Sequence, residues 1–208
     1  LFHRVIANFM IQAGDPDSKK ASPDAVLGSG DVGYSIPAEF VYPKYYHKKG
    51  ALAAAREGDN ENPQKASSGC QFYIVKGKVF TDAELDAMEK SKELKLESQY
   101  FKELLDANNE MIKKMRDEKN QEKLNAFRDS AMTIVRKKIK ENPTHKFSIQ
   151  QRTDYKTIGG TPHLDGSYTV FGEVVEGLDI VVNISNVKTG EADRPVEDVR
   201  ILKAKRIK

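Results

Sequence analysis

Residues 1–16, LFHRVIANFMIQAGDP, decide how the fold is interpreted. Apolar side chains dominate this stretch, which favours one strand or two short strands packed against a core. Arg4 and Gln12 are the polar exceptions, and a guanidinium beside Phe and Met is costly to bury unless something accepts its hydrogen bonds. An arginine that extends from a strand end into water is the ordinary alternative. Residues 13–16, AGDP, then have turn chemistry.

The composition describes a polar chain able to bury a core. Its 208 residues fit one domain, or one domain with a large insertion. The net charge of +3 is too weak to argue for nucleic acid by itself. No apolar run approaches the roughly 18 residues of a membrane span. Cys70 is the single cysteine, which excludes an internal disulfide.

Further strands are predicted in the first half of the chain. Residues 33–40, GYSIPAEF, alternate apolar and polar side chains, and residues 49–57, KGALAAARE, are short and apolar. Residues 70–75, CQFYIV, are the strongest strand prediction. Gln71 is polar within it, and its exposure on the solvent face is the ordinary alternative. His47 lies in an aromatic, basic segment and is interpreted as a surface residue.

From Thr81 the apolar spacing becomes helical. Thr81 and Glu84 form a capping-box pattern, residues 116–121 are a charged break, and a second helical stretch ends at residues 142–143, Asn-Pro. A helical hairpin is therefore predicted. It is either a solvated antiparallel pair or an arm that binds partners or clients.

The second half returns to short elements. Residues 146–158 are predicted to be extended, 168–175 to form a strand, and 178–184 to make one or two helical turns. Residues 195–207 read as a final strand, with a basic end interpreted as solvated rather than as a nucleic-acid patch.

Four blocks in order carry a family resemblance: FHRVIANFMIQAGDP, GYSIPAEF, GALAAAREGDN with SSGCQFYIV, and TPHLDGSYTVFGEVVEGLDIV. They resemble the cyclophilins, the cyclophilin-type peptidyl-prolyl isomerases. The resemblance implies a mainly β fold, a closed antiparallel β-barrel of eight strands with short helices, into which the α-helical hairpin is inserted. Residues 1–80 and 143–208 would then form the barrel, and residues 81–142 the insertion.

The family places two strands and a helix before the FHR motif, and the sequence given has neither. A barrel lacking those strands would expose an unpaired edge. We therefore expect the chain to be a fragment, or to be completed by other residues or another chain.

The resemblance also implies the site residues. Arg4 takes the position of the catalytic arginine, and Phe9 and Gln12 complete the catalytic set. The residues implied in substrate binding are Met10, Ala55, Arg56, Gln71, Tyr73, His163, Leu164 and Tyr168. Phe9, Met10, Tyr73 and Leu164 would wall the proline pocket, and Ala55 and Arg56 would pair with the substrate backbone. Gln12 would help hold Arg4 and contact the carbonyl that precedes the proline.

Three of these positions depart from the family pattern. Arg56 stands where many members have Asn, at a position that works through its main chain. His163 stands where some members have a Trp that helps bind cyclosporin, which puts drug sensitivity in question. Tyr168 replaces a histidine of eukaryotic members, and a ring with a polar tip can still line the pocket.

The implied reaction is rotation about an X–Pro amide, which breaks no bond. The twisted amide has a pyramidal nitrogen with a lone pair, to which Arg4 can donate, whereas the planar amide nitrogen accepts no hydrogen bond. We expect no metal, nucleotide or other cofactor, and the four histidines lack ligand spacing. We also expect no covalent nucleophile, because Cys70 lies within the predicted strand, where a buried thiol is the better interpretation.

The expected substrates are proline-containing peptides and unfolded or folding proteins. The main alternative is a non-catalytic peptide-binding or chaperone module that works through the hairpin, although the pair Arg4 and Gln12 argues against it. Nucleic-acid binding is a weaker third interpretation. By resemblance only, a bacterial cell envelope or periplasm is favoured over the cytoplasm.

Overall fold

The computed structural model describes residues 1–207, and the described chain divides into two compact units. The first, here called the sheet unit, holds Leu1–Phe80 and the chain from Gln150 onward. The second, the hairpin unit, holds Thr81–Ile149. The second division falls at Gln150 rather than at residue 143 because the connecting segment bonds back to the hairpin. Glu89 accepts from the Phe147 amide at 3.0 Å and from Lys146 Nζ at 2.9 Å.

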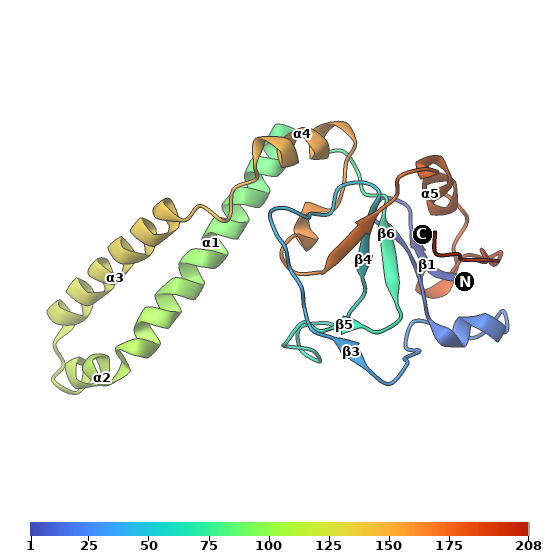
Figure 1. Ribbon diagram of the computed structural model, residues 1–208. Helices are drawn as coiled ribbons and strands as arrows, with labels where there is room; N and C mark the ends of the chain where they lie inside the picture. The colour runs from blue at the N-terminus through green and yellow to red at the C-terminus, as the bar shows by residue number, and fades with distance from the viewer. Residues whose placement is uncertain (208) are drawn as a thin grey trace. The chain divides into compact units, whose positions relative to one another are not determined.

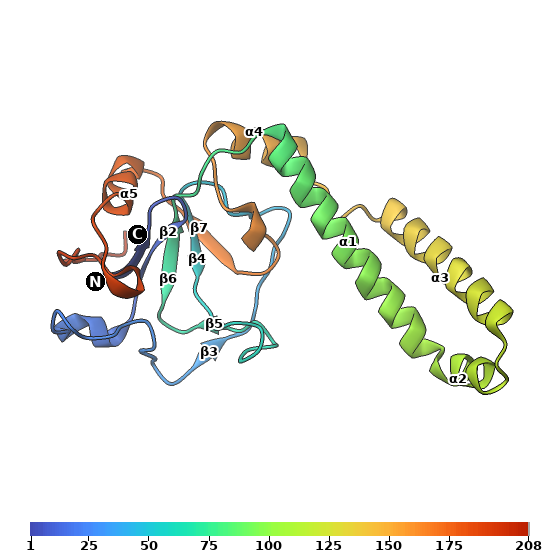
Figure 2. The same cartoon turned by 180° about the vertical axis from the view of Figure 1, so that it is seen from behind.

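The sheet unit is built on a five-stranded antiparallel sheet. The strand order is β1 (Phe2–Ile6), β2 (Met10–Ala13), β6 (Phe72–Val75), β4 (Ala51–Ala54) and β7 (Val170–Glu173). These strands lie side by side in Figures 1 and 2. A second pair joins β3 (Ser35–Ile36) to β5 (Ser67–Ser68). The expected strands in the first half of the chain are thus confirmed, each with fewer residues than predicted.

The sheet is open, so the expectation of a closed barrel is wrong for the residues described here. Strands β1 and β7 are its two edges. Closure needs a ladder that joins the edges, and beyond its pairing with β2 the β1 backbone has a single bond to residues 195–207, from the Phe2 amide to the Val199 carbonyl at 2.9 Å. The final strand predicted there is therefore also wrong.

Short helices complete the sheet unit. They are α4 (Ile149–Thr157), α5 (Leu178–Ser185) and the 3-10 turns η1 (Pro16–Lys20), η2 (Pro162–Leu164) and η3 (Glu191–Asp193). The expected turns at 178–184 are confirmed as α5. The extended conformation expected for residues 146–158 is wrong, because most of that segment forms α4. Its Tyr155 is fully buried, with its ring edge-on to Tyr46 and Phe80.

One irregularity in the pairing of β1 with β2 sets the faces of the sheet that Phe2 and His3 occupy. Phe2 lies opposite Ala13 and Arg4 opposite Gln12, so His3 is an extra residue in β1. In regular alternation Phe2 and Arg4 would share a face, and a bulge of one residue reverses this. Phe2 packs with Val5, Ile11 and Val181 of α5, while His3 and Arg4 line a cavity on the opposite face.

That opposite face carries the second part of the core. It contains Met10, Ala51, Ala53, Ala55, Tyr73, Val75 and Leu164, with Ile6, Phe9, Tyr168 and Val170 packed against them. The alanines of β4 are small, which leaves room for large side chains from β2, β6 and η2 to meet above the strand. The core is therefore continuous with the cavity.

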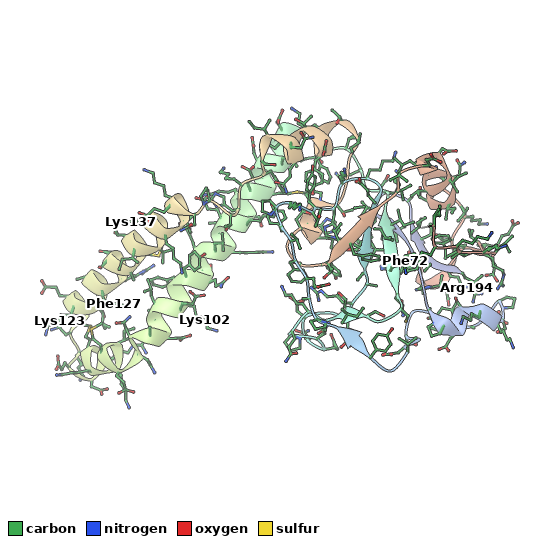
Figure 3. All side chains as sticks on the ribbon, viewed as in Figure 1. Phe72, Lys102, Lys123, Phe127, Lys137 and Arg194 are labelled. Carbon is green, nitrogen blue, oxygen red and sulfur yellow. The ribbon has the colours of Figure 1, made fainter. Side chains whose placement is uncertain are left out.

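The hairpin unit contains α1 (Asp82–Ala107), α2 (Asn109–Asp117) and α3 (Gln121–Glu141). The capping box is confirmed: Thr81 Oγ1 accepts from the Glu84 amide, and Glu84 accepts from the Thr81 amide. Ile112, Ala131, Val135 and Ile139 are buried. Figure 3 shows Lys102, Lys123 and Lys137 on this unit, where all three are exposed. None of the described helices combines the length and hydrophobicity of a membrane span.

Asp15 ties the loop after β2 to the sheet unit. Gly14, at φ +97°, turns the chain so close to the Cys70 carbonyl that a side chain would not fit. The buried Asp15 carboxylate then accepts from the amides of Asp17 at 2.8 Å, Gly28 at 2.5 Å and Gly30 at 3.3 Å. Burial alone would raise the pKa of this carboxyl, but the amides of Gly28, Asp17 and Gly30 outweigh it and lower the pKa.

We predict that Asp15→Ala lowers the free energy of unfolding by about 1–3 kcal/mol at pH 7, because three amides lose their acceptor. The folded pKa lies below the unfolded value of about 3.9, so this stabilisation is present above pH 4 and is lost as the pH falls further. Urea unfolding at pH 7 and near pH 3 measures it. Asp24→Ala, in the same loop and exposed, is the control. An equal wild-type advantage at both pH values would contradict the account.

Candidate functional site

A cavity of about 520 Å³ opens on the face of the sheet that carries Arg4. Nine of the eleven predicted site residues line it: Arg4, Phe9, Met10, Gln12, Ala55, Arg56, Tyr73, Leu164 and Tyr168. His3, Leu27, Gly28, Ala192 and Asp193 line it as well. Three of the four sequence blocks that carried the resemblance therefore converge on one cavity, and residues 33–40 do not line it.

The apolar wall comes from three separate elements. Met10 begins β2, Tyr73 lies opposite Gln12 on β6, and Leu164 ends η2; all three are buried. Phe9 lies in the tight turn between β1 and β2, where its amide donates to the Ile6 carbonyl at 3.0 Å. His163 does not line the cavity but stacks on Phe9, with ring centroids 5.5 Å apart. It therefore supports the wall from outside.

Arg4 is restrained at one nitrogen. Its Nε donates to Asp193 Oδ2 at 3.3 Å, and both side chains are about half exposed, at 42% and 44%. No bond from Arg4 to Gln12 is found in the described chain. The expectation that Gln12 helps hold Arg4 is therefore wrong, because the Gln12 amide donates to Gln71 Oε1 at 3.0 Å instead. Asp193 was missed, since it lies far along the sequence in a loop without a motif.

Gln71 is buried and does not reach the main cavity. Its amide nitrogen donates to the carbonyls of Gly28 and Gly30, each at 2.9 Å. It lines an adjoining cavity of about 420 Å³, which shares Gln12, Gly28, Ala55 and Arg56 with the first. The alternative in which Gln71 faces solvent is thus excluded, and Gln71 acts on the site by fixing Gln12.

Arg56 and Tyr168 form the rim of the cavity. The Arg56 guanidinium lies 4.3 Å from the centre of the Tyr168 ring, and its Nε donates to the Ser167 carbonyl at 2.9 Å. Ala55 has its amide bonded to the Gln71 carbonyl and its own carbonyl to the Ser68 amide. Within the described chain, the main chain of Arg56 is therefore the part of this segment left for a bound peptide.

A buried polar network lies beneath the apolar wall, and it includes His47. His47 Nε2 and the Tyr73 hydroxyl are 3.0 Å apart, and His47 Nδ1 is 3.1 Å from Asp165 Oδ1. Asp165 also accepts from the Tyr155 hydroxyl at 2.5 Å. Only 1% of His47 is exposed, so its interpretation as a surface residue is wrong. Burial raises the pKa of Tyr73 and of Tyr155, which keeps both hydroxyls protonated.

Metal ligation has no candidate among residues 1–207, where no group of three or more His, Cys, Asp or Glu side chains is arranged to hold an ion. The chemistry available in the cavity is the cationic donor Arg4 beside an apolar wall, since the other guanidinium, that of Arg56, is bonded to Ser167, Glu57 and Asp59. Such a site can bind a small apolar ring and donate a hydrogen bond to an atom at its edge.

We predict that Tyr73→Phe lowers the free energy of unfolding by about 1–2 kcal/mol, because the buried His47 Nε2 loses its partner. Thermal and urea unfolding measure the loss. Tyr34→Phe is the matched control, since that side chain is 60% exposed. The same loss in both variants would show that the hydroxyl beneath the pocket has no special role.

The comparisons with known proteins agree with the family resemblance seen in the sequence. The family model described as cyclophilin type peptidyl-prolyl cis-trans isomerase/CLD matches residues 1–91 and 86–206. A protein of Staphylococcus epidermidis named "Putative peptidyl-prolyl cis-trans isomerase" is 27% identical over 201 residues, which cover 96% of this chain and 68% of that protein. One of the same name from Staphylococcus haemolyticus is 29% identical over 202 residues, with the same coverage of both chains. The chain therefore belongs to the cyclophilin-type peptidyl-prolyl cis-trans isomerases.

Proposed function

We propose that the isomerase works by donating a hydrogen bond from the terminal Nη groups of Arg4 to the prolyl nitrogen of a peptide. The observation that carries this is the geometry of Arg4: its Nε bonds to Asp193, at the edge of a cavity of about 520 Å³ that has one apolar wall. Restraint at Nε leaves both Nη groups to donate. Phe9, Met10, Tyr73 and Leu164 would hold the proline ring while the preceding carbonyl rotates.

The donation distinguishes the transition state from the ground state. A planar amide delocalises the nitrogen lone pair, and rotation through the barrier of about 18–20 kcal/mol localises it. A donor placed at the nitrogen therefore stabilises the twisted state more than the planar one, which is the requirement for catalysis. By analogy with the loss of an oxyanion donor, this bond supplies about 3 kcal/mol, or roughly a hundredfold in rate.

Gln12 takes a different part from the one expected. Its amide nitrogen is committed to Gln71, which is itself fixed to the carbonyls of Gly28 and Gly30. We assign Gln12 to the floor of the site between the two cavities, where its side chain faces a peptide that crosses from one to the other. The main chain of Arg56 is the edge along which that peptide would lie.

We predict that Arg4→Ala lowers kcat/KM for a short X–Pro peptide about a hundredfold, because the donor to the prolyl nitrogen is lost. Isomer exchange in the peptide, followed by exchange-NMR spectroscopy, measures the rate. The companion variant is Arg4→Lys, which keeps the positive charge but replaces the planar guanidinium with a compact ammonium group. It should recover only part of the loss. Unchanged exchange in Arg4→Ala, with the fold intact, would exclude Arg4 from the reaction.

The proposed substrates are X–Pro bonds in unfolded or folding proteins, and we propose that the hairpin unit contacts these clients or a protein partner. Two features support a role for the hairpin unit other than the isomerisation reaction itself. No described residue of the hairpin lines the cavity. Leu94, Met111 and Ile134 are apolar, and 41–52% of each is exposed on the hairpin.

Removal of residues 81–149 separates the two tasks. Phe80 and Tyr155 are bonded from amide to carbonyl at 2.9 Å, so a short Gly-Ser linker from Phe80 to Gln150 can close the gap. We predict that the shortened chain keeps its exchange rate on a short peptide and loses most of its rate advantage on an unfolded protein with prolines. Equal losses on both substrates would contradict a separate task for the hairpin.

The bacterial cell envelope stays a prediction from the resemblance. Fractionation of the cells that produce the protein would test it.

A further inference from the structure

The loop that carries Asp193 is held in an unusual shape. Ala192 and Asp193 have φ values of +53° and +60°, in the left-handed region that residues with a side chain seldom adopt. Two such residues in succession are costly and persist only where the surroundings impose them. The Gly190 amide donates to the Arg194 carbonyl at 2.7 Å, and the Val196 amide to the Lys188 carbonyl at 2.9 Å. The loop therefore closes on itself.

Arg194 fixes this loop to a distant part of the sheet unit. Its Nη1 donates to the carbonyls of Ser22 at 3.0 Å and Ala25 at 2.8 Å, and its Nη2 to Asp198 at 3.0 Å. Figure 3 shows Arg194 on the C-terminal part of the chain. Its side chain is only 12% exposed. The neighbouring Asp193 is thereby presented to the cavity from a fixed support.

The ion pair between Arg4 and Asp193 adds little to the stability of the fold. Arg4 and Asp193 are each about half exposed, and exposed ion pairs are weak because water screens them. The stability gained from this weak ion pair therefore does not explain why the backbone is held in a costly conformation. The reason lies in which nitrogen is used, because Asp193 accepts from Nε and leaves both Nη groups of Arg4, a residue that lines the cavity, to donate elsewhere.

We propose that Asp193 is a positioning residue, which aligns the Arg4 guanidinium for donation to the prolyl nitrogen. This rests on the proposed function of Arg4. The prolyl nitrogen is a neutral acceptor, so a correctly directed N–H matters more than the full positive charge. A carboxylate at Nε sets the plane of the guanidinium, and a misplacement of about 1 Å at such a donor can cost a hundredfold. No other described side chain is bonded to Arg4, so the alignment depends on Asp193.

The test compares Asp193→Ala, Asp193→Asn and the control Glu191→Ala, which removes a charge from the same loop. In isomer exchange of an X–Pro peptide, Asp193→Ala should lower kcat about tenfold with KM and the melting temperature unchanged, since a partly misaligned donor loses part of its effect. Asp193→Asn keeps an acceptor oxygen and should recover most of kcat. Glu191→Ala should match the wild type.

A second readout follows the Arg4 Nε–H directly. In ¹⁵N-labelled protein its cross-peak should move on Asp193→Ala and return toward its original position in Asp193→Asn. An Asp193→Ala variant as fast as the wild type would overturn the proposal, and a faster one would show instead that Asp193 withholds Arg4 from the peptide. An unchanged rate in Asp193→Ala beside a large loss in Arg4→Ala would reject only the role of Asp193. Unchanged rates in both would reject the function proposed for Arg4 as well.

Discussion

The site depends on the register of one short strand. Arg4 pairs with Gln12 and Val5 with Ile11, so regular alternation places Arg4 on the face opposite Val5, above the apolar wall. The bulge at His3 interrupts this alternation, so that Phe2 packs on the same face as Val5 while His3 lines the cavity beside Arg4. An extra residue in an edge strand thus fills the core on one face and adds a side chain to the site on the other, and bulges are common beside active sites.

A catalytic arginine must be held in place by contacts that leave some of its N–H groups available to the substrate. Its guanidinium has five N–H groups, and a partner that took the Nη pair would compete with the peptide. The structure places the carboxylate at Nε, and it fixes Gln12 and Gln71 to each other and to the backbone. The wall is held similarly, since Tyr73 reaches through His47 to the buried Asp165. The apolar surface offered to a proline ring therefore rests on a polar network out of reach of water.

The sequence predicted what local chemistry determines. The capping box at Thr81 marked the start of α1, and the charged break marked the end of α2. The site residues converged because three of the four blocks supplied the walls of the cavity. Contacts between distant segments could not be predicted from local patterns. Asp193 contacts Arg4 across most of the chain, and His47 is buried by Tyr73 and Asp165 from distant segments. Residues 149–157 were misread because Tyr155 packs against Phe80 and Tyr46, which the local apolar spacing does not reveal.

The central claim is that Arg4 meets a prolyl nitrogen from a fixed support beside an apolar wall. A crystal structure of the protein with a bound X–Pro peptide tests it most directly. The account predicts the proline ring against Phe9, Met10 and Leu164, an Arg4 Nη within hydrogen-bonding reach of the prolyl nitrogen, and Nε still on Asp193. A proline ring bound elsewhere, with the guanidinium turned toward bulk water, would contradict it.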